Sequence, residues 1–409
     1  MTTAELKQIL TTFAAKIPGT VLGPERVRYI IEHINEIPVE QRMAILQLTN
    51  FILGAMIDRQ ASDVEIGGFG AQNCVWFRIF GKKERVMDLP QFTEDESSTL
   101  IVSLLNKNQC EYLLEYRNID FSYSFRYEKI QSNVRFRADA YFDLDSLALN
   151  MRAIQSRIRP IESLDFHPFA VKTMSHGYIK FGLSLVTGIT GSGKSTTLDA
   201  IIDYHNDSDP CHVVIIASPV EYVHKSRKSI IKHREVGRDV TSFKDGVTQA
   251  LRQDPDIIVI GEMRDPETIM AALEVTDTGH KVFSTLHTSS AVESIDRIIA
   301  EVNPGEQERV RNRLADVLIS VVSQKLVPSL DGKRVLAKEV LIVTPSVRAA
   351  IKNNNTSEIY MMINQGGIQG MITMEQDLMR LFTEKKISKE NTVAYANNKT
   401  RILQLLKGV

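Results

Sequence analysis

The segment from residue 188 to 195 reads Gly-Ile-Thr-Gly-Ser-Gly-Lys-Ser, and its residue types and spacing suit the binding of phosphate. The glycines let successive backbone N–H groups turn toward a phosphate chain, Lys194 adds positive charge, and the hydroxyl of Ser195 is a ligand for Mg²⁺. The pattern is that of a P-loop and predicts a bound nucleotide with Mg²⁺. The residues expected to contact it are Gly188, Ile189, Thr190, Gly191, Ser192, Gly193, Lys194, Ser195 and Thr196.

A P-loop needs a strand before it and a helix after it. The apolar run 181–187 predicts a buried strand, and residues 196–204 predict a helix whose positive N-terminal end faces the phosphates. A chance match in a glycine-rich surface loop is the alternative, and the flanking elements argue against it.

Two further segments carry candidate catalytic groups. The run Asp256-Ile-Ile-Val-Ile-Gly-Glu262 is an apolar strand that ends in an acid, and Glu262 at its tip could orient and polarise an attacking water, unless it is only a solvated acid at a strand end. His287 follows another apolar strand, where it could sense a γ-phosphate or bond the acid, or simply be a core histidine. By contrast, Asp265-Pro266-Glu267 predicts only a helix N-cap.

Composition limits the function classes. The chain has 409 residues, enough for two or three domains, and 43% are hydrophobic, which suffices for ordinary globular cores. Lys and Arg number 49 against 50 Asp and Glu, so binding of nucleic acid is not expected as the main activity. Cys74, Cys110 and Cys211 stand too far apart for a disulfide framework or zinc cluster, which favours a reducing cytosol. We expect neither a signal peptide nor a membrane-spanning segment.

The pattern along the chain predicts four regions. A helical extension leads into a domain of alternating apolar residues, typical of an α+β domain with antiparallel strands. After a basic linker, strands and helices alternate as in a parallel sheet covered by helices. The expected regions are 1–45, helical extension; 46–156, α+β domain; 157–365, nucleotide-binding domain; and 366–409, helical segment.

With these motifs the chain resembles the PilT family of type IV pilus retraction ATPases from about residue 46 to 395. The resemblance rests on the P-loop, on the segments 233–236, 253–268 and 278–288, on 61–66, 120–124 and 135–137 upstream, and on 366–371 downstream. It implies an α/β RecA-like P-loop ATPase core with a smaller PAS-like α+β N-terminal domain and helical extensions. It also implies that ATP and Mg²⁺ are the ligands.

The resemblance implies roles for single residues. Glu262 matches the catalytic acid, His287 the His box, and Glu221 the last acid of the Asp box. Arg137 and Arg152 match arginines that reach the nucleotide phosphates in this family, where each would neutralise charge on the transferring group; a surface salt bridge is the alternative for either.

At the level of assembly, the resemblance implies a cytoplasmic homohexamer, peripheral to the bacterial inner membrane, that acts on a pilus platform protein and powers retraction. Closure of the site on ATP would move one domain against the other, with the basic linker from Arg152 to Pro160 as the hinge.

Two departures from the family keep alternatives open. The Asp box, roughly Glu-Asp-Pro-Ile-Glu in the family, is Ala217-Ser218-Pro219-Val220-Glu221 here, so two acids are missing. The segment 344–352 keeps only part of the helix that couples such motors to their track. Besides a retraction motor, we therefore consider a PilU-like accessory ring with weak hydrolysis, a secretion or pilus-extension ATPase, and a DNA motor. Secretion and pilus-extension ATPases usually carry a four-cysteine zinc module, which the three cysteines of this chain cannot form.

The extension itself has an apolar helical face. Met43, Ile45, Leu46, Leu48, Thr49, Ile52 and Leu53 recur at helical spacing. This face could dock a partner, but packing on its own domain is the expected outcome.

Overall fold

The computed structural model describes residues 1–154 and 158–407. Their contacts divide the chain into two compact units, each with its own hydrophobic core. A third, smaller apolar cluster lies among the C-terminal helices. The first unit comprises Met1–Ser156, Ser218–Tyr222 and Gly237–Asp239, and the second comprises Arg157–Ala217, Val223–Val236 and Val240–Val409.

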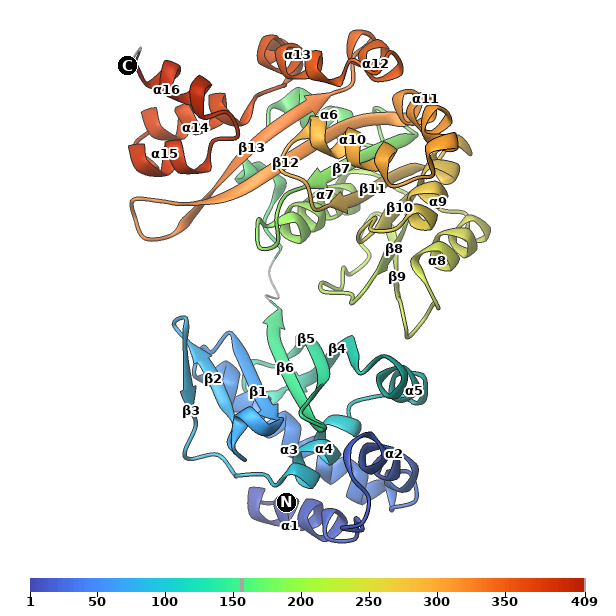
Figure 1. Ribbon diagram of the computed structural model, residues 1–409, viewed down its shortest axis with the longest axis vertical. Coiled ribbons are helices and arrows are strands. Elements are labelled where there is room, and N and C mark those ends of the chain that lie inside the picture. Colours follow the sequence, from blue (N-terminus) through green and yellow to red (C-terminus); the bar gives the residue numbers. More distant parts are fainter. Residues whose placement is uncertain (155–157, 408–409) are drawn as a thin grey trace. The chain divides into compact units, whose positions relative to one another are not determined.

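A six-stranded antiparallel sheet forms the centre of the first unit, in the order β3-β2-β1-β6-β5-β4 (Figure 1). The predicted alternation is confirmed, because Phe77, Phe136 and Ala138 are buried on one face while their neighbours along each strand are more exposed. The strands are β1 (Asp63–Gly67), β2 (Trp76–Ile79), β3 (Lys82–Arg85), β4 (Asn118–Tyr127), β5 (Ser132–Asp143) and β6 (Ser146–Ile154).

Five helices accompany this sheet. Three begin with a capping box in which an N-cap side chain and the N3 side chain satisfy backbone N–H groups reciprocally, as Thr2 and Glu5 do in the first. The Gly23-Pro24 pair begins the second helix, where proline is tolerated. The helices are α1 (Thr3–Ala14), α2 (Gly23–Ile34), α3 (Val39–Asp58), α4 (Glu94–Val102) and α5 (Lys107–Tyr116).

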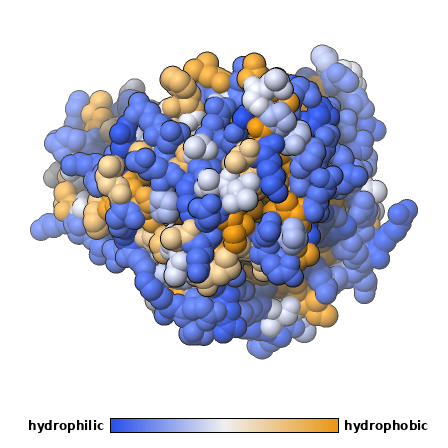
Figure 2. Space-filling view, turned by 90° about the horizontal axis from the view of Figure 1, so that it is seen from below, coloured by the Kyte–Doolittle hydropathy of each residue, from blue (hydrophilic) through white to orange (hydrophobic). Residues whose placement is uncertain are grey.

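The apolar face of α3 packs on its own unit, as expected. Ile45, Leu48, Ile52 and Leu53 are all fully buried and belong to the core of the first unit. Leu46 is only partly buried, and Met43 has 51% of its surface exposed. Figure 2 shows hydrophobic residues gathered near the middle of the face seen from below, surrounded by hydrophilic ones.

Removal of α1 and α2 is expected to unfold the first unit. These helices contribute Leu6, Leu10, Phe13, Val27, Ile30 and Ile34 to its core. Each buried side chain of this kind is worth about 1.5–3 kcal/mol, so the loss approaches the whole stability of an ordinary domain, about 5–15 kcal/mol. A variant lacking residues 1–35 should be insoluble or lose its cooperative thermal transition. Leu10→Ala is a milder test, and it is expected to lower the free energy of unfolding by about 2–5 kcal/mol. An unchanged melting temperature in both variants would contradict a stabilising role for these helices.

The placement of Arg152 in the interdomain linker is wrong. Strand β6 continues through Ile154, and Arg152 pairs within the sheet opposite Asp63 and Arg137. The prediction was wrong because Arg152 is followed by basic residues at 157 and 159, so all three look like parts of one basic linker. The middle of the expected hinge, residues 155–157, lies outside the described part of the chain.

The second unit contains a seven-stranded sheet in the order β13-β12-β7-β11-β10-β8-β9. All pairs are parallel except the antiparallel pair of β12 and β13, which confirms the predicted α/β class. Central strands covered on both faces become continuous apolar runs, as in β10, where all four residues are buried. The strands are β7 (Gly182–Thr187), β8 (His212–Ala217), β9 (Ile230–Glu235), β10 (Ile257–Ile260), β11 (Lys281–Leu286), β12 (Leu318–Pro328) and β13 (Arg334–Ile342).

Helices surround this sheet and extend beyond its antiparallel edge (Figure 1). Asp265 caps α9 by accepting from the backbone N–H of Thr268, as predicted. Among the described residues, none of the helices combines the length and the apolar character needed to cross a bilayer. The helices are α6 (Pro168–Met174), α7 (Lys194–Ser208), α8 (Phe243–Ala250), α9 (Pro266–Asp277), α10 (Ala291–Ala300), α11 (Gln307–Val317), α12 (Pro345–Lys352), α13 (Ile359–Gln365), α14 (Met374–Thr383), α15 (Lys389–Tyr395) and α16 (Lys399–Lys407).

Candidate active site

The P-loop joins the end of β7 to the start of α7, so the predicted order of strand, loop and helix is confirmed. The helix begins at Lys194, two residues before its expected start, and no side chain caps it because its N-cap is Gly193. Gly193 has φ 89°, a left-handed conformation that glycine adopts without a steric penalty. The first N–H groups of α7 therefore face the loop and not a capping side chain, an arrangement suited to an anion.

Close packing beneath the loop explains its first glycine. A Cβ at Gly188 would lie 2.5 Å from the backbone oxygen of Gln324 and would also collide with Oγ of Ser192. Gln324, on β12, donates from Nε2 to the backbone oxygen of Ser192 at 2.8 Å. The loop thus rests on a neighbouring strand that lies far from it in the sequence.

Polar groups in the loop fit a phosphate chain. Nζ of Lys194 donates to the backbone oxygens of Gly188 and Ile189, at 2.8 and 3.2 Å. Oγ of Ser192 and Oε1 of Gln324 are buried without a hydrogen-bond partner. Ser195 and Thr196 are exposed at the start of the helix, where their hydroxyls are accessible. Uncapped amides, a lysine and exposed hydroxyls are the donor set that a triphosphate with Mg²⁺ requires.

Glu262 and His287 meet beyond the ends of adjacent parallel strands. β10 ends at Ile260, two residues before Glu262, and β11 ends immediately before His287. Nε2 of His287 lies 3.8 Å from Oε2 of Glu262, whose side chain is only 17% exposed. Because β11 also pairs in parallel with β7, both residues lie at the same edge of the sheet as the P-loop.

Positive charge surrounds this acid and histidine. Nε of Arg264 lies 2.7 Å from Oε2 of Glu262. Burial, followed by the positive charges of Lys194, Arg264 and Arg297, lowers the pKa of His287 below its ordinary value. Protonation of the imidazole would add a cation among three others, so His287 is held neutral near neutral pH.

The other three candidates form a second group, in the first unit. Nη1 of Arg137 lies 3.7 Å from Oε1 of Glu221, and Nη2 of Arg137 lies 3.4 Å from a carboxylate oxygen of Asp120. Nε of Arg152 donates to Oδ1 of Asp63 at 2.8 Å. These contacts bring Arg137 and Glu221 together and link Arg152 to Asp63, which lies in the motif 61–66 but has no role predicted from the sequence.

Sequence reasoning gave no role to Arg264 or Gln324. Arg264 had a local signal, since it stands two residues after the candidate acid. Gln324 had none, because it reaches the P-loop only through the pairing of β12 with β7. Side chains supplied by a neighbouring strand cannot be located from the motif itself.

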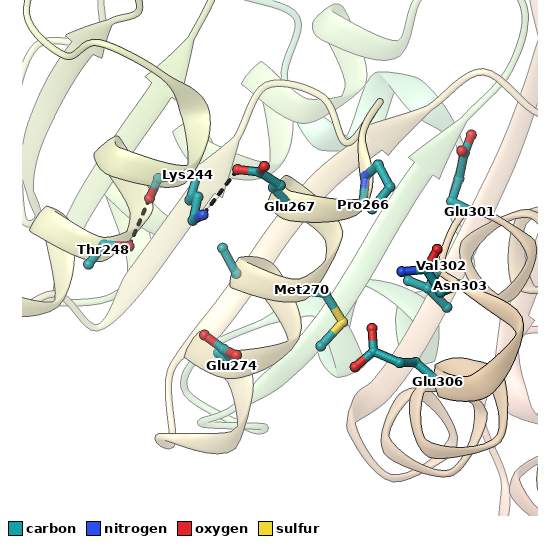
Figure 3. A pocket seen from close by; sticks show the side chains of 11 residues that line it. Lys244, Thr248, Pro266, Glu267, Met270, Glu274, Glu301, Val302, Asn303 and Glu306 are labelled. Carbon is teal, nitrogen blue, oxygen red and sulfur yellow. Dashed lines mark hydrogen bonds and ion pairs between the residues drawn. The ribbon is translucent and has the colours of Figure 1, made fainter.

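A separate cavity of about 350 Å³ lies between α8, α9 and the segment after α10 (Figure 3). Its lining includes Glu267, Glu274, Glu301 and Glu306, and only Lys244 among the lining residues is basic, paired with Glu267 at 3.0 Å. None of these residues belongs to the P-loop. An acidic lining repels a triphosphate, so this cavity is not the nucleotide site. Within the described residues, no group of three or more His, Cys, Asp or Glu side chains is arranged to hold a metal ion.

Comparison with known proteins agrees with this geometry. Residues 39–404 match the type II/IV secretion system protein family. The type IV pilus retraction ATPase PilT of Pseudomonas aeruginosa is 39% identical over 77% of this chain and 89% of its own length. The type IV pilus ATPase PilU of the same organism is 31% identical over 87% of this chain and 90% of its own length.

A solved structure gives the same result. A crystal structure of the pilus retraction motor PilT with bound ADP has a TM-score of 0.76 and 36% identity, and the match covers 86% of this chain and 98% of that one. Sequence and fold therefore agree over most of the length. The chain belongs to the type II/IV secretion system protein family, and within it to the branch of the PilT-like ATPases.

Proposed function

We propose that this protein is a PilT-like ATPase that hydrolyses ATP to power retraction of a type IV pilus. The observation that carries the proposal is the convergence of the P-loop, Glu262 and His287 at one edge of the sheet in the second unit. Similarity to a retraction ATPase over most of both chains supports the cellular role. The greater identity to PilT than to PilU favours a motor over an accessory ring.

Binding of the nucleotide is assigned to the P-loop and the start of α7. Backbone amides of the loop, such as those of Gly191 and Gly193, would surround the phosphates, and Lys194 would exchange its two carbonyl contacts for phosphate oxygens. The hydroxyl of Ser195 is the protein ligand available to Mg²⁺, which, when bound, neutralises phosphate charge. Ser192, whose buried hydroxyl has no partner, can donate a further hydrogen bond to a phosphate oxygen.

Activation of water is assigned to Glu262. Its carboxylate accepts a hydrogen bond from the attacking water and orients it. His287 lies beside it in the neutral form and so does not compete as a second full cation for the carboxylate. Arg264 pairs with the same oxygen that faces His287, so it fixes the orientation of the acid.

We propose that three residues of the first unit assist ATP hydrolysis, namely Arg137, Arg152 and Glu221. The arginines would neutralise charge on the transferring phosphoryl group, an effect worth about 10³- to 10⁵-fold in rate for arginine fingers. Glu221, the retained acid of the Asp box, lies 3.7 Å from Arg137 and would orient it. The P-loop, Glu262 and His287 belong to the second unit, whereas Arg137, Arg152 and Glu221 belong to the first. We propose that relative motion of the two units couples hydrolysis to work.

We infer further that the protein works as a cytoplasmic hexameric ring at the inner-membrane pilus platform. Steady-state ATPase measurement on the purified protein tests hydrolysis. The mass of the protein from light scattering, measured with and without Mg²⁺ and ATP, tests assembly. Deletion of the gene should leave cells with pili that extend but do not retract. A purified protein that neither binds nor turns over ATP would remove the proposal.

A second candidate is an accessory ring with weak hydrolysis, and the reduced Asp box favours it. Ala217 ends β8 and Ser218 follows, where the family carries two acids. Restoring them in an Ala217→Glu, Ser218→Asp variant should raise kcat by about 10-fold if their absence limits metal support, since such supporting groups are typically worth 10- to 100-fold. The matched control is Ser208→Asp, an exposed serine at the end of α7. Robust turnover in the unmodified protein, unchanged by restoration, would exclude the accessory role.

A further inference from the structure

The strand register of the first unit aligns one residue from every strand of its sheet. Arg78 lies opposite both Lys83 and Asp63, Arg152 lies opposite both Asp63 and Arg137, and Arg137 lies opposite Ser122. Residues directly opposite each other in neighbouring strands project to the same face of a sheet. We call this line the basic row: Lys83, Arg78, Asp63, Arg152, Arg137 and Ser122.

The basic row lies on the face away from the core of the first unit. Val64, next to Asp63, lies opposite Phe77 and Met151, and all three are fully or almost fully buried in that core. Because successive side chains alternate between faces, the row occupies the other side. There, 70% of the Arg152 side chain is exposed, and Arg78 and Arg137 are 38% and 43% exposed.

Asp63 is the buried member at the centre of the row. Only 6% of its side chain is exposed. Its Oδ1 accepts from Nε of Arg152 at 2.8 Å, and its Oδ2 lies 3.6 Å from Nε of Arg78. The hydroxyl of Ser62 donates to Oδ2 at 2.6 Å and fixes the carboxylate in turn. One anchored carboxylate thus holds two arginines from opposite sides.

Asp63 binds Arg152 at the guanidinium nitrogen nearest the main chain. A guanidinium has five N–H donors, and Asp63 takes the one on Nε, which is nearest the chain. The two terminal nitrogens can make paired contacts with a phosphate, and 70% of the Arg152 side chain is exposed.

Repulsion between neighbouring cations of the basic row also favours a carboxylate placed between them. Arg152 and Arg137 are directly opposite, and like charges in that arrangement repel and destabilise a sheet. Asp120 and Glu221 lie beside Arg137, and Glu65 pairs with Lys83, so the outer cations have other carboxylates. Asp63 is the carboxylate that lies between Arg152 and Arg78.

We propose that Asp63 is a positioning residue for ATP hydrolysis: it holds Arg152, with Arg78 on its other side, so that the terminal nitrogens of Arg152 present to a phosphoryl group. The inference rests on the proposed function and on the phosphate-contacting role of Arg152. Asp63 itself touches neither nucleotide nor water. Its effect on the rate is transmitted entirely through the arginine.

The test is a double-mutant cycle on the assembled full-length protein. Asp63→Asn keeps the shape of the side chain and removes its charge, and it is expected to lower kcat by about 10- to 100-fold, the usual effect of losing a group that orients a catalytic one. The KM for ATP should stay near the wild-type value, because the P-loop is untouched. In an Arg152→Gln background, Asp63→Asn should cause no further loss of kcat, since the residue it positions is already gone.

Controls separate positioning from stability. Asp95→Asn breaks another carboxylate–arginine pair of the first unit, in which Asp95 contacts Arg26 at 2.5 and 2.6 Å; it should lower the melting temperature and leave kcat unchanged. Arg152→Lys keeps a positive charge but has no Nε–H for Asp63, and should reproduce the loss in kcat even if Asp63→Asn does not fold. An equal loss from Asp63→Asn in both backgrounds, or full activity in Asp63→Asn or Arg152→Lys, would overturn the inference.

Failure of this inference about Asp63 can be distinguished from failure of the proposed function. If Glu262→Gln and Arg152→Gln both retain full turnover, the proposed ATPase site is wrong. If Glu262→Gln is inactive while Arg152→Gln is fully active, the ATPase site stands and the role of Asp63 is overturned.

Discussion

Glu262→Gln should abolish ATP hydrolysis while the protein still binds ATP. The amide has the size of the carboxylate but cannot accept a proton from water, and loss of such a group typically costs about 10²- to 10⁴-fold in rate. Lys194 and Gln324 donate to backbone oxygens of the P-loop, and the substitution leaves these contacts in place, so affinity for ATP should be preserved. Steady-state turnover, together with equilibrium binding of a fluorescent ATP analogue, measures the two quantities separately.

Glu267→Gln is the matched control for that experiment. Glu267 stands five residues later, in the first turn of α9, and its side chain is 69% exposed and pairs with Lys244. Its neutralisation should leave turnover near the wild-type value, because an exposed ion pair is worth little. Turnover retained in Glu262→Gln would remove this residue from its role. A simultaneous loss of ATP binding would indicate that Glu262 supports the loop instead.

Gly188→Ala should abolish the binding of ATP without any change of charge. The added methyl group would lie 2.5 Å from the backbone oxygen of Gln324, and that oxygen belongs to a strand in the sheet and cannot move aside easily. The P-loop must shift instead, and a displacement of about 1 Å in such a site can cost about 100-fold. Titration with ATP, and turnover at saturating ATP, should both show the loss.

Gly305→Ala is the corresponding control. A Cβ at Gly305 would meet nothing within 4 Å, and Gly305 is absent from the positions with positive φ. This substitution should leave ATP binding and the melting temperature unchanged. If Gly188→Ala bound ATP as well as Gly305→Ala does, the tight contact between the P-loop and β12 would not limit the site.

Local sequence predicted the elements that carry the nucleotide site. The strand before the P-loop and the helix after it were confirmed, and so was the N-cap at Asp265. These features depend on residues within a few positions of each other, such as a proline at N1 or an apolar run between breakers. The parallel sheet followed from the alternation of such elements.

Local sequence did not predict the end of β6, because no residue type near Arg152 indicates that the strand continues past it. Arg152 was placed in a linker because basic residues follow it, whereas the pairing of β6 with β1 and β5 extends the strand past it. Strand ends are fixed by hydrogen bonds to neighbouring strands, which depend on residues distant in the sequence.

The sequence by itself determined that a phosphate-binding loop stands between a strand and a helix and that an acid and a histidine follow two later strands. Only the tertiary structure decided that Glu262 and His287 lie 3.8 Å apart, that Gln324 supports the P-loop, and that Asp63 joins Arg152 to Arg78. The physical reason is that motifs report backbone conformation over a few residues, whereas these contacts arise from the order and register of strands far apart in the chain.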